Sequence, residues 1–273
     1  MSKVRVLVVE DSLTVRRHLV AVLDADPDIE VIAEAEDGKT AIELCERLRP
    51  DVVTLDMMLP IMTGLAATEY IMAYCPTPIV IVSSSTNRGE LFKTYDALAA
   101  GAVEAMEKPG GDEFDGYWER RFASTVKLLA KIKVITHIRG RWRPPAFGAL
   151  RSAPVRAGGP YRCVALGAST GGPAALLQIL RELPSDFRLP ILLVIHLSPV
   201  LGGGFADWMG SQLSIPVAFA VDGEPLPPCG APRVVLAPPD RHLVLRAGRL
   251  RLTGDAERFS CRPSVDVLFQ SVA

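Results

Sequence analysis

The chain has 273 residues, of which 49% are hydrophobic and 22% charged, so it can bury a substantial core. Its 30 basic and 31 acidic residues leave a net charge of −1, which argues against a nucleic-acid-binding or membrane-surface protein. At about 150 residues per domain, this length predicts two domains.

Five cysteines, with no CxxC pair among them, favour free thiols in a reducing compartment over a disulfide framework or a zinc site. The N-terminus has no signal-peptide pattern, and the most apolar run, residues 191–195, is far too short to span a bilayer. We therefore expect a soluble cytoplasmic protein.

In residues 1–109, two kinds of segment alternate along the chain. Strand-like apolar runs occupy residues 4–9, 31–33, 52–55, 79–82 and 103–106, and segments with helical spacing occupy residues 13–23, 40–48, 65–74 and 91–100. This alternation predicts an α/β domain with a doubly wound, five-stranded parallel sheet and helices on both faces.

Polar side chains follow the strands of this predicted sheet. Glu10 and Asp11 follow the first strand, Asp56 ends the third, Ser83 ends the fourth and Lys108 follows the fifth. The carboxyl ends of parallel strands share one edge, so these groups should converge there. Three carboxylates need a counter-ion, and oxygen ligands suit Mg²⁺. Any single acid could be a solvated loop residue, but five converging groups favour a site that accepts a phosphoryl group.

Residues 1–109 resemble a response-regulator receiver domain. The stretches that carry the resemblance are Val9-Glu10-Asp11-Ser12, Leu55-Asp56-Met57-Met58-Leu59-Pro60, Val82-Ser83-Ser84 and Lys108-Pro109. The resemblance implies that Asp56 accepts phosphate from a partner histidine kinase, and that Glu10, Asp11, Asp56 and the carbonyl of Met58 bind Mg²⁺. It also implies that Ser83 is the switch hydroxyl and Lys108 the phosphate contact. Glu10 stands where aspartate is commoner.

Residues 110–160 form the expected connector. An amphipathic stretch at 117–135 predicts the closing helix of the first domain. Residues 137–162 contain six arginines, several prolines and glycines, and no acidic residue. This composition fits a solvated tether better than a nucleic-acid patch, because proline and glycine prevent a packed surface.

The expected second domain, residues 161–273, opens with an apolar run that meets Gly167-Ala168-Ser169-Thr170-Gly171-Gly172, followed by a helical segment at 174–183. The spacing Gly-x-Ser-x-Gly between a strand and a helix is typical of a nucleophile elbow, which exposes the serine hydroxyl. The N–H groups that open the helix could hold an oxyanion. A plain glycine-rich turn and a phosphate loop remain alternatives.

His196 follows the apolar run 188–195, at the carboxyl end of the next predicted strand. Ser169 and His196 would then share one sheet edge, as a nucleophile and its base must. A lone histidine at a strand end is more often structural, but the elbow serine on the same edge favours catalysis.

Further elements are expected as a helix at 205–213, short strands at 234–236, 243–245 and 250–252, and an apolar helical stripe at 265–272.

This half is similar to the catalytic domain of chemotaxis protein-glutamate methylesterases. The matching stretches are the elbow, His196, Asp222-Gly223, Ala237-Pro238-Pro239-Asp240-Arg241-His242 and Arg262-Pro263-Ser264-Val265-Asp266-Val267-Leu268-Phe269. The resemblance implies that Ser169 is the nucleophile, His196 the base and the Thr170 N–H part of the oxyanion hole. The implied substrate is a methyl-esterified glutamate on a chemoreceptor helix, with glutamine deamidation in related members. Joined to a receiver, the domain would be activated by phosphorylation and need no cofactor for ester hydrolysis.

The family's triad aspartate lies in a Gly-Met-Gly-x-Asp-Gly stretch, which this sequence does not contain. We therefore expect a C-terminally truncated methylesterase domain, poorly folded and nearly inactive, because losing the orienting acid costs about 10⁴ in kcat. The competing hypothesis is a phospho-switched binding protein whose hydrolase half is catalytically dead. A receiver-linked transcription regulator would need a helix-turn-helix, and the second half presents a hydroxyl elbow instead.

Overall fold

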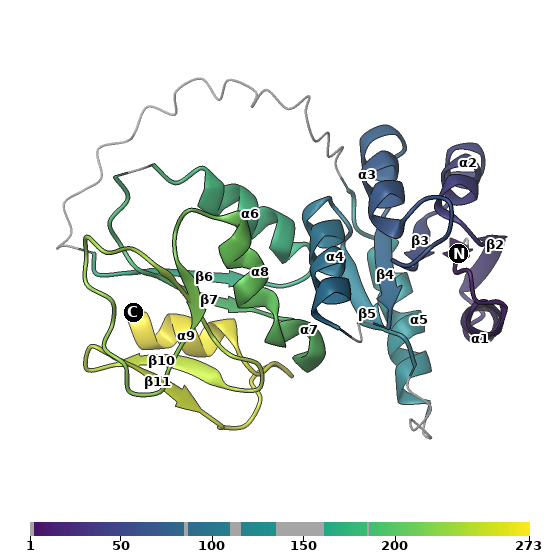
Figure 1. Cartoon of the computed structure of the whole chain (residues 1–273). Helices are drawn as coiled ribbons and strands as arrows, with labels where there is room; N and C mark the ends of the chain where they lie inside the picture. Colours follow the sequence, from purple (N-terminus) through teal and green to yellow (C-terminus); the bar gives the residue numbers. More distant parts are fainter. Residues whose placement is uncertain (1–2, 85–86, 110–115, 135–160, 185) are drawn as a thin grey trace. The chain divides into compact units, whose positions relative to one another are not determined.

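The computed structural model describes residues 3–84, 87–109, 116–134, 161–184 and 186–273 (Figure 1). The chain divides into two compact units, residues 1–142 and residues 143–273. Apart from its last two residues, the tether expected at 137–162 lies outside the described residues.

The first unit contains one parallel sheet in the order β2-β1-β3-β4-β5. Its strands are β1 (Val4–Val9), β2 (Ile29–Ala35), β3 (Val52–Leu55), β4 (Ile79–Ser83) and β5 (Glu104–Glu107). Its helices are α1 (Leu13–Asp24), α2 (Gly38–Leu48), α3 (Gly64–Tyr74), α4 (Arg88–Ala99) and α5 (Tyr117–Leu129). Figure 1 shows α1 and α5 on one face of the sheet and α2, α3 and α4 on the other. The predicted five-stranded, doubly wound fold is confirmed.

Burial explains why these segments become strands. Every residue of β3 and β4 is buried, as expected for parallel strands covered on both faces. Three helices of the first unit begin where a polar side chain accepts hydrogen bonds from their first N–H groups: Asp37 before α2, Thr63 before α3 and Asn87 before α4. Polar caps therefore set helix starts that the apolar pattern alone does not locate.

Helix α5 is shorter than the sequence predicted. Its buried stripe of Trp118, Phe122, Val126 and Leu129 packs into the core of the first unit. After Leu129 the helical hydrogen bonds give way to a tighter turn, in which Lys131 N donates to Leu128 O at 3.1 Å and Ile132 N to Leu129 O at 2.9 Å. The predicted continuation to residue 134 is therefore wrong, and residue 135 lies outside the described residues.

The second unit has a four-stranded parallel sheet in the order β6-β7-β9-β8. Its elements are β6 (Val164–Ala168), α6 (Gly172–Arg181), β7 (Ile191–Ile195), α7 (Pro199–Gly203), α8 (Phe205–Gln212), β8 (Val217–Phe219), β9 (Val234–Leu236), β10 (His242–Arg246), β11 (Arg249–Thr253) and α9 (Val265–Val272). The predicted second α/β domain is confirmed, although the sequence did not predict α7 or β8.

A hairpin and the last helix complete this unit. Strands β10 and β11 pair antiparallel, and α9 packs against β10, where Leu245 N donates to Ser271 Oγ at 3.0 Å (Figure 1). The interior strands β7 and β9 are fully buried, whereas β6 lies at the edge of the sheet and is only partly covered. No described helix in either unit has the length and apolar character needed to cross a bilayer.

Candidate functional sites

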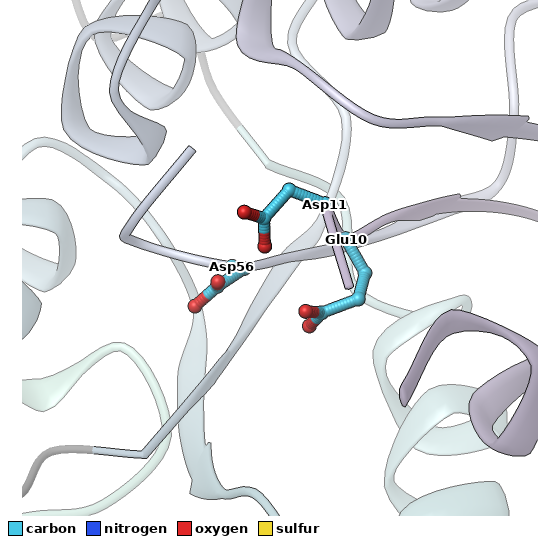
Figure 2. A group of neighbouring side chains, drawn as sticks. All are labelled: Glu10, Asp11 and Asp56. Atoms are coloured by element: carbon cyan, nitrogen blue, oxygen red, sulfur yellow. The ribbon is translucent and has the colours of Figure 1, made fainter. Parts of the chain in front are cut away.

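The first candidate site is an acidic cluster at the carboxyl edge of the first sheet. Glu10 and Asp11 follow β1, and Asp56 follows the adjacent β3, where Val9 pairs with Leu55. Each residue offers a carboxylate oxygen, and these oxygens lie within 4.8 Å of one another (Figure 2). Glu10 and Asp56 are buried and Asp11 is exposed. Such a set of hard oxygen ligands, open to water on one side, suits Mg²⁺.

One ammonium group reaches into this cluster from the end of β5. Lys108 Nζ donates to Asp56 Oδ2 and to Glu10 Oε1, each at 3.0 Å. It also lies 2.8 Å from Glu10 Oε2, but without hydrogen-bond geometry. Lys108 contacts two of the three carboxylates, those of Glu10 and Asp56, so negative charge remains in excess and a divalent cation would offset it.

Burial and pairing act on the ionisation of this cluster. Burial raises the pKa of Glu10, opposed by the hydrogen bond from Lys108. Burial by itself lowers the pKa of Lys108, but the hydrogen bond to Glu10 and the charge of Asp56 outweigh it, so this pKa is raised. Lys108 therefore stays cationic beside Glu10 and Asp56.

Asp56 and Ser83 lie on neighbouring strands of the same edge. Asp56 Oδ1 accepts a hydrogen bond from Met57 N at 2.7 Å, which fixes the carboxylate. Ser83 ends β4, and its buried Oγ has no hydrogen-bond partner among the described residues. Because an unpaired buried hydroxyl is costly, Ser83 is ready to bond a group that enters the site.

The second candidate site is the carboxyl edge of β6 and β7. Ala168 pairs with Ile195 in the parallel ladder, so the next residues, Ser169 and His196, emerge side by side. Ser169 is exposed, and its carbonyl accepts a hydrogen bond from Gly172 N at 2.6 Å. This tight turn needs Gly171, whose φ is +73°. Thr170 follows Ser169 in the same exposed turn, before α6 begins.

His196 has the properties of a base. Partial burial lowers the pKa of its imidazole, which favours the neutral form. Its Nε2 is buried and has no hydrogen-bond partner among the described residues, Ser169 included. A nucleophile–base hydrogen bond that is missing without substrate can form in the complex, so the arrangement suits proton transfer.

The sequence did not predict the partner of the other imidazole nitrogen. Cys261 Sγ lies 3.7 Å from His196 Nδ1, in the segment between β11 and α9. In the described structure this thiol, rather than an aspartate, contacts Nδ1. The one available signal was the place of Cys261, immediately before the matched Arg262-Pro263 stretch.

His242 organises the same segment. This buried histidine bonds Ala256 O through Nε2 at 3.2 Å and accepts from Ser264 N through Nδ1 at 3.1 Å. Both ends of the segment that carries Cys261 are thereby fixed to β10. His242 is thus a structural residue that holds the segment from which Cys261 contacts His196.

Comparisons with known proteins match both halves of the chain. The family model of the response regulator receiver domain matches residues 6–114, and that of the CheB methylesterase matches residues 164–273. The crystal structure of the Thermotoga maritima CheB methylesterase catalytic domain is similar at 33% identity and a TM-score of 0.38, covering 42% of this chain and 61% of that one.

Two curated relatives match nearly the whole chain. Protein-glutamate methylesterase/protein-glutamine glutaminase 4 of Myxococcus xanthus is 44% identical over 98% of this chain and 76% of its own length. The protein-glutamate methylesterase/protein-glutamine glutaminase of Nitrosospira multiformis is 41% identical over 99% of this chain and 76% of its own length. The chain therefore belongs to the protein-glutamate methylesterase/protein-glutamine glutaminase family, with a receiver domain followed by a methylesterase domain.

Proposed function

We propose that the second domain hydrolyses methyl esters of glutamate side chains on chemoreceptors, with Ser169 as nucleophile and His196 as general base. One observation carries the proposal: the pairing of Ala168 with Ile195 delivers both side chains to the same sheet edge. A neutral imidazole with an unpaired buried nitrogen is suited to take the serine proton.

The proposed reaction has two steps. Ser169 Oγ attacks the ester carbonyl while His196 accepts its proton, and the N–H of Thr170 stabilises the oxyanion. His196 then gives the proton to the leaving methanol, and water, activated by His196, hydrolyses the acyl-enzyme to free glutamate. A glutamine side chain would follow the same path with ammonia as the leaving group.

We further propose that Asp56 is phosphorylated by a histidine kinase and that this activates the ester hydrolysis. Glu10, Asp11, Asp56 and the carbonyl of Met58 would hold Mg²⁺, which when bound neutralises charge on the transferred phosphoryl group. The excess negative charge of the cluster supports this assignment. After transfer, Lys108 would pair with the phosphate and Ser83 would bond one of its oxygens. This change at Asp56 would raise ester hydrolysis by the methylesterase domain.

A second candidate function is a phospho-switched binding protein with an inactive hydrolase half. The contact of Cys261 with His196 Nδ1 favours it, because a thiol accepts a hydrogen bond from imidazole much less well than a carboxylate does. Weak orientation of the base would lower turnover.

Methanol release from methylated chemoreceptors distinguishes the two functions. We expect Ser169→Ala to lower kcat by about 10³-fold or more relative to the unmodified protein. Ser211→Ala is the control, because Ser211 is an exposed serine in α8 that bonds Trp208 O within its own helix. Equal methanol release by Ser169→Ala and the unmodified protein would refute the enzyme proposal.

A further inference from the structure

The segment that reaches His196 contains an unusual two-residue turn. Arg258 and Cys261 exchange two backbone hydrogen bonds of 3.2 Å, so Phe259 and Ser260 form the tip between them. Both tip residues have positive φ, 51° for Phe259 and 58° for Ser260. Tight turns of this kind favour Asn-Gly, because most side chains are strained there. Phenylalanine is therefore held in a conformation that its own backbone disfavours.

The ring of Phe259 is presented to solvent and held there. Its exposed fraction is 78%. The Arg258 guanidinium lies 5.9 Å from the ring centroid, and Arg258 Nη1 donates to Gln270 Oε1 on α9 at 2.6 Å. Single exposed apolar residues are ordinary on protein surfaces. An exposed ring on strained backbone is not ordinary in this sense. Backbone strain persists only where the surrounding structure enforces it, and strained residues are found most often at functional sites.

The turn is anchored directly beside the proposed base. Its last residue, Cys261, contacts His196 Nδ1 at 3.7 Å. The next residue, Arg262, is fixed by Asp240 Oδ1 at 2.7 Å from Nε and by Asp255 O at 3.1 Å from Nη1. The exposed ring is thus two residues from a contact on His196, on a segment held at several points.

We propose that Phe259 is a substrate-specificity residue, whose ring binds an apolar side chain of the substrate protein next to the methyl-esterified glutamate. This inference rests on the proposed function, since it assigns the ring to the same substrate. A small ester has no neighbouring side chain to reach the turn, so the ring would favour esters carried on a protein. A ring with few torsions on an anchored turn loses little conformational entropy on binding.

The test compares two substrates of the full chain and its variants. The change is Phe259→Gly, because glycine accepts positive φ and the turn keeps its shape. We expect kcat/KM to fall about tenfold more for methylated chemoreceptor than for N-acetyl-glutamate γ-methyl ester. Phe259→Leu should recover part of the difference, and Phe269→Ala, which removes another exposed phenylalanine, on α9, should leave both rates unchanged. Equal effects of Phe259→Gly on the two substrates would overturn the inference.

A binding measurement tests this inference independently of the proposed function. If the unmodified protein hydrolyses neither substrate, the esterase proposal fails, and the Kd for methylated chemoreceptor decides the role of the ring. A Kd five to ten times weaker in Phe259→Gly would support the contact. An unchanged Kd would exclude it.

Discussion

At the level of single residues, the environment of His196 sets its chemistry. Partial burial lowers the pKa of the imidazole, and no described carboxylate contacts the ring to raise it again. A base must be neutral to accept a proton. The lowered pKa would therefore let His196, the proposed base, stay neutral at a lower pH than a free imidazole, whose pKa is about 6.5.

The pH dependence of ester hydrolysis should report this shift. We expect kcat/KM to rise with pH through an apparent pKa below about 6.5 and to stay level above it, because protonated His196 is inactive. A pH–rate profile with a small ester measures it, and His18→Gln, in the first unit, should keep the same profile. An acid limb centred above pH 7 would contradict the assignment.

Ile61 shows strain near the proposed phosphorylation site. Its φ is +63°, and Met62 N donates to Pro60 O at 2.6 Å, which closes a γ-turn around it. The side chain is 84% exposed, so packing offsets little of the strain of a β-branched residue in this conformation.

Replacing Ile61 with glycine should therefore stabilise the fold. We expect Ile61→Gly to raise the free energy of unfolding by about 0.5 to 1 kcal/mol, measured by urea unfolding. Glu43→Gly, at an exposed position inside α2, should lower it by about 1 kcal/mol. Loss of stability in Ile61→Gly would show that the turn is not strained.

At the level of elements, strand β6 and helix α9 fit closely because Gly167 has no side chain. A Cβ at this position would lie 2.3 Å from Cγ1 and 2.7 Å from Cγ2 of Val265, the first residue of α9. The glycine two residues before Ser169 therefore also serves the packing of a helix that begins 98 residues later.

Gly167→Ala should separate these two elements. We expect a loss of about 1 to 3 kcal/mol in the free energy of unfolding and slower ester hydrolysis, since the strand that carries Ser169 must move. Adding Val265→Ala removes both clashing methyl groups and leaves only its Cβ, at 3.1 Å, so the double variant should recover most of the loss. Thermal and urea unfolding of the four proteins measure the coupling, and additive losses would argue against direct packing.

Elements were predictable where burial dominates the sequence pattern. The continuous apolar runs of β1, β3 and β9 gave their bounds correctly. Helix α2 begins at Gly38, two residues before its prediction, because the Asp37 cap lies outside the apolar pattern. Strand β8 has only three residues, too few for a recognisable period. The contact of Cys261 with His196 spans 65 residues of sequence, and no local pattern records it.

At the level of the whole molecule, one chain carries an acidic cluster in one unit and a serine–histidine edge in the other. The predicted parallel strands made both arrangements predictable, because residues that follow parallel strands lie at one edge of the sheet. The ionisation of each group depends on burial and pairing, which only the folded structure supplies.

Phosphorylation of Asp56 in the first unit should raise the rate of ester hydrolysis in the second. With Mg²⁺ and acetyl phosphate as phosphodonor, we expect kcat/KM for methylated chemoreceptor to rise by about 5- to 150-fold, the usual range of allosteric coupling. Asp56→Asn should abolish the rise, and Asp28→Asn, an exposed acid of the same domain, should retain it. If Asp56→Ala without phosphodonor matched the phosphorylated protein, phosphorylation of Asp56 would be the wrong explanation for the rise.

The ladder between β6 and β7 also limits how this chain can vary in length. Inserting one residue into either strand would displace one side chain along the ladder by about 3.3 Å and turn it to the opposite face of the sheet. Length changes in the loops, such as the one between α6 and β7, leave the alignment of Ala168 with Ile195 intact. Insertions and deletions that keep Ser169 and His196 together should therefore fall between the elements. An insertion or deletion within β6 or β7 should separate the Ser169 hydroxyl from the His196 imidazole, even where the protein still folds.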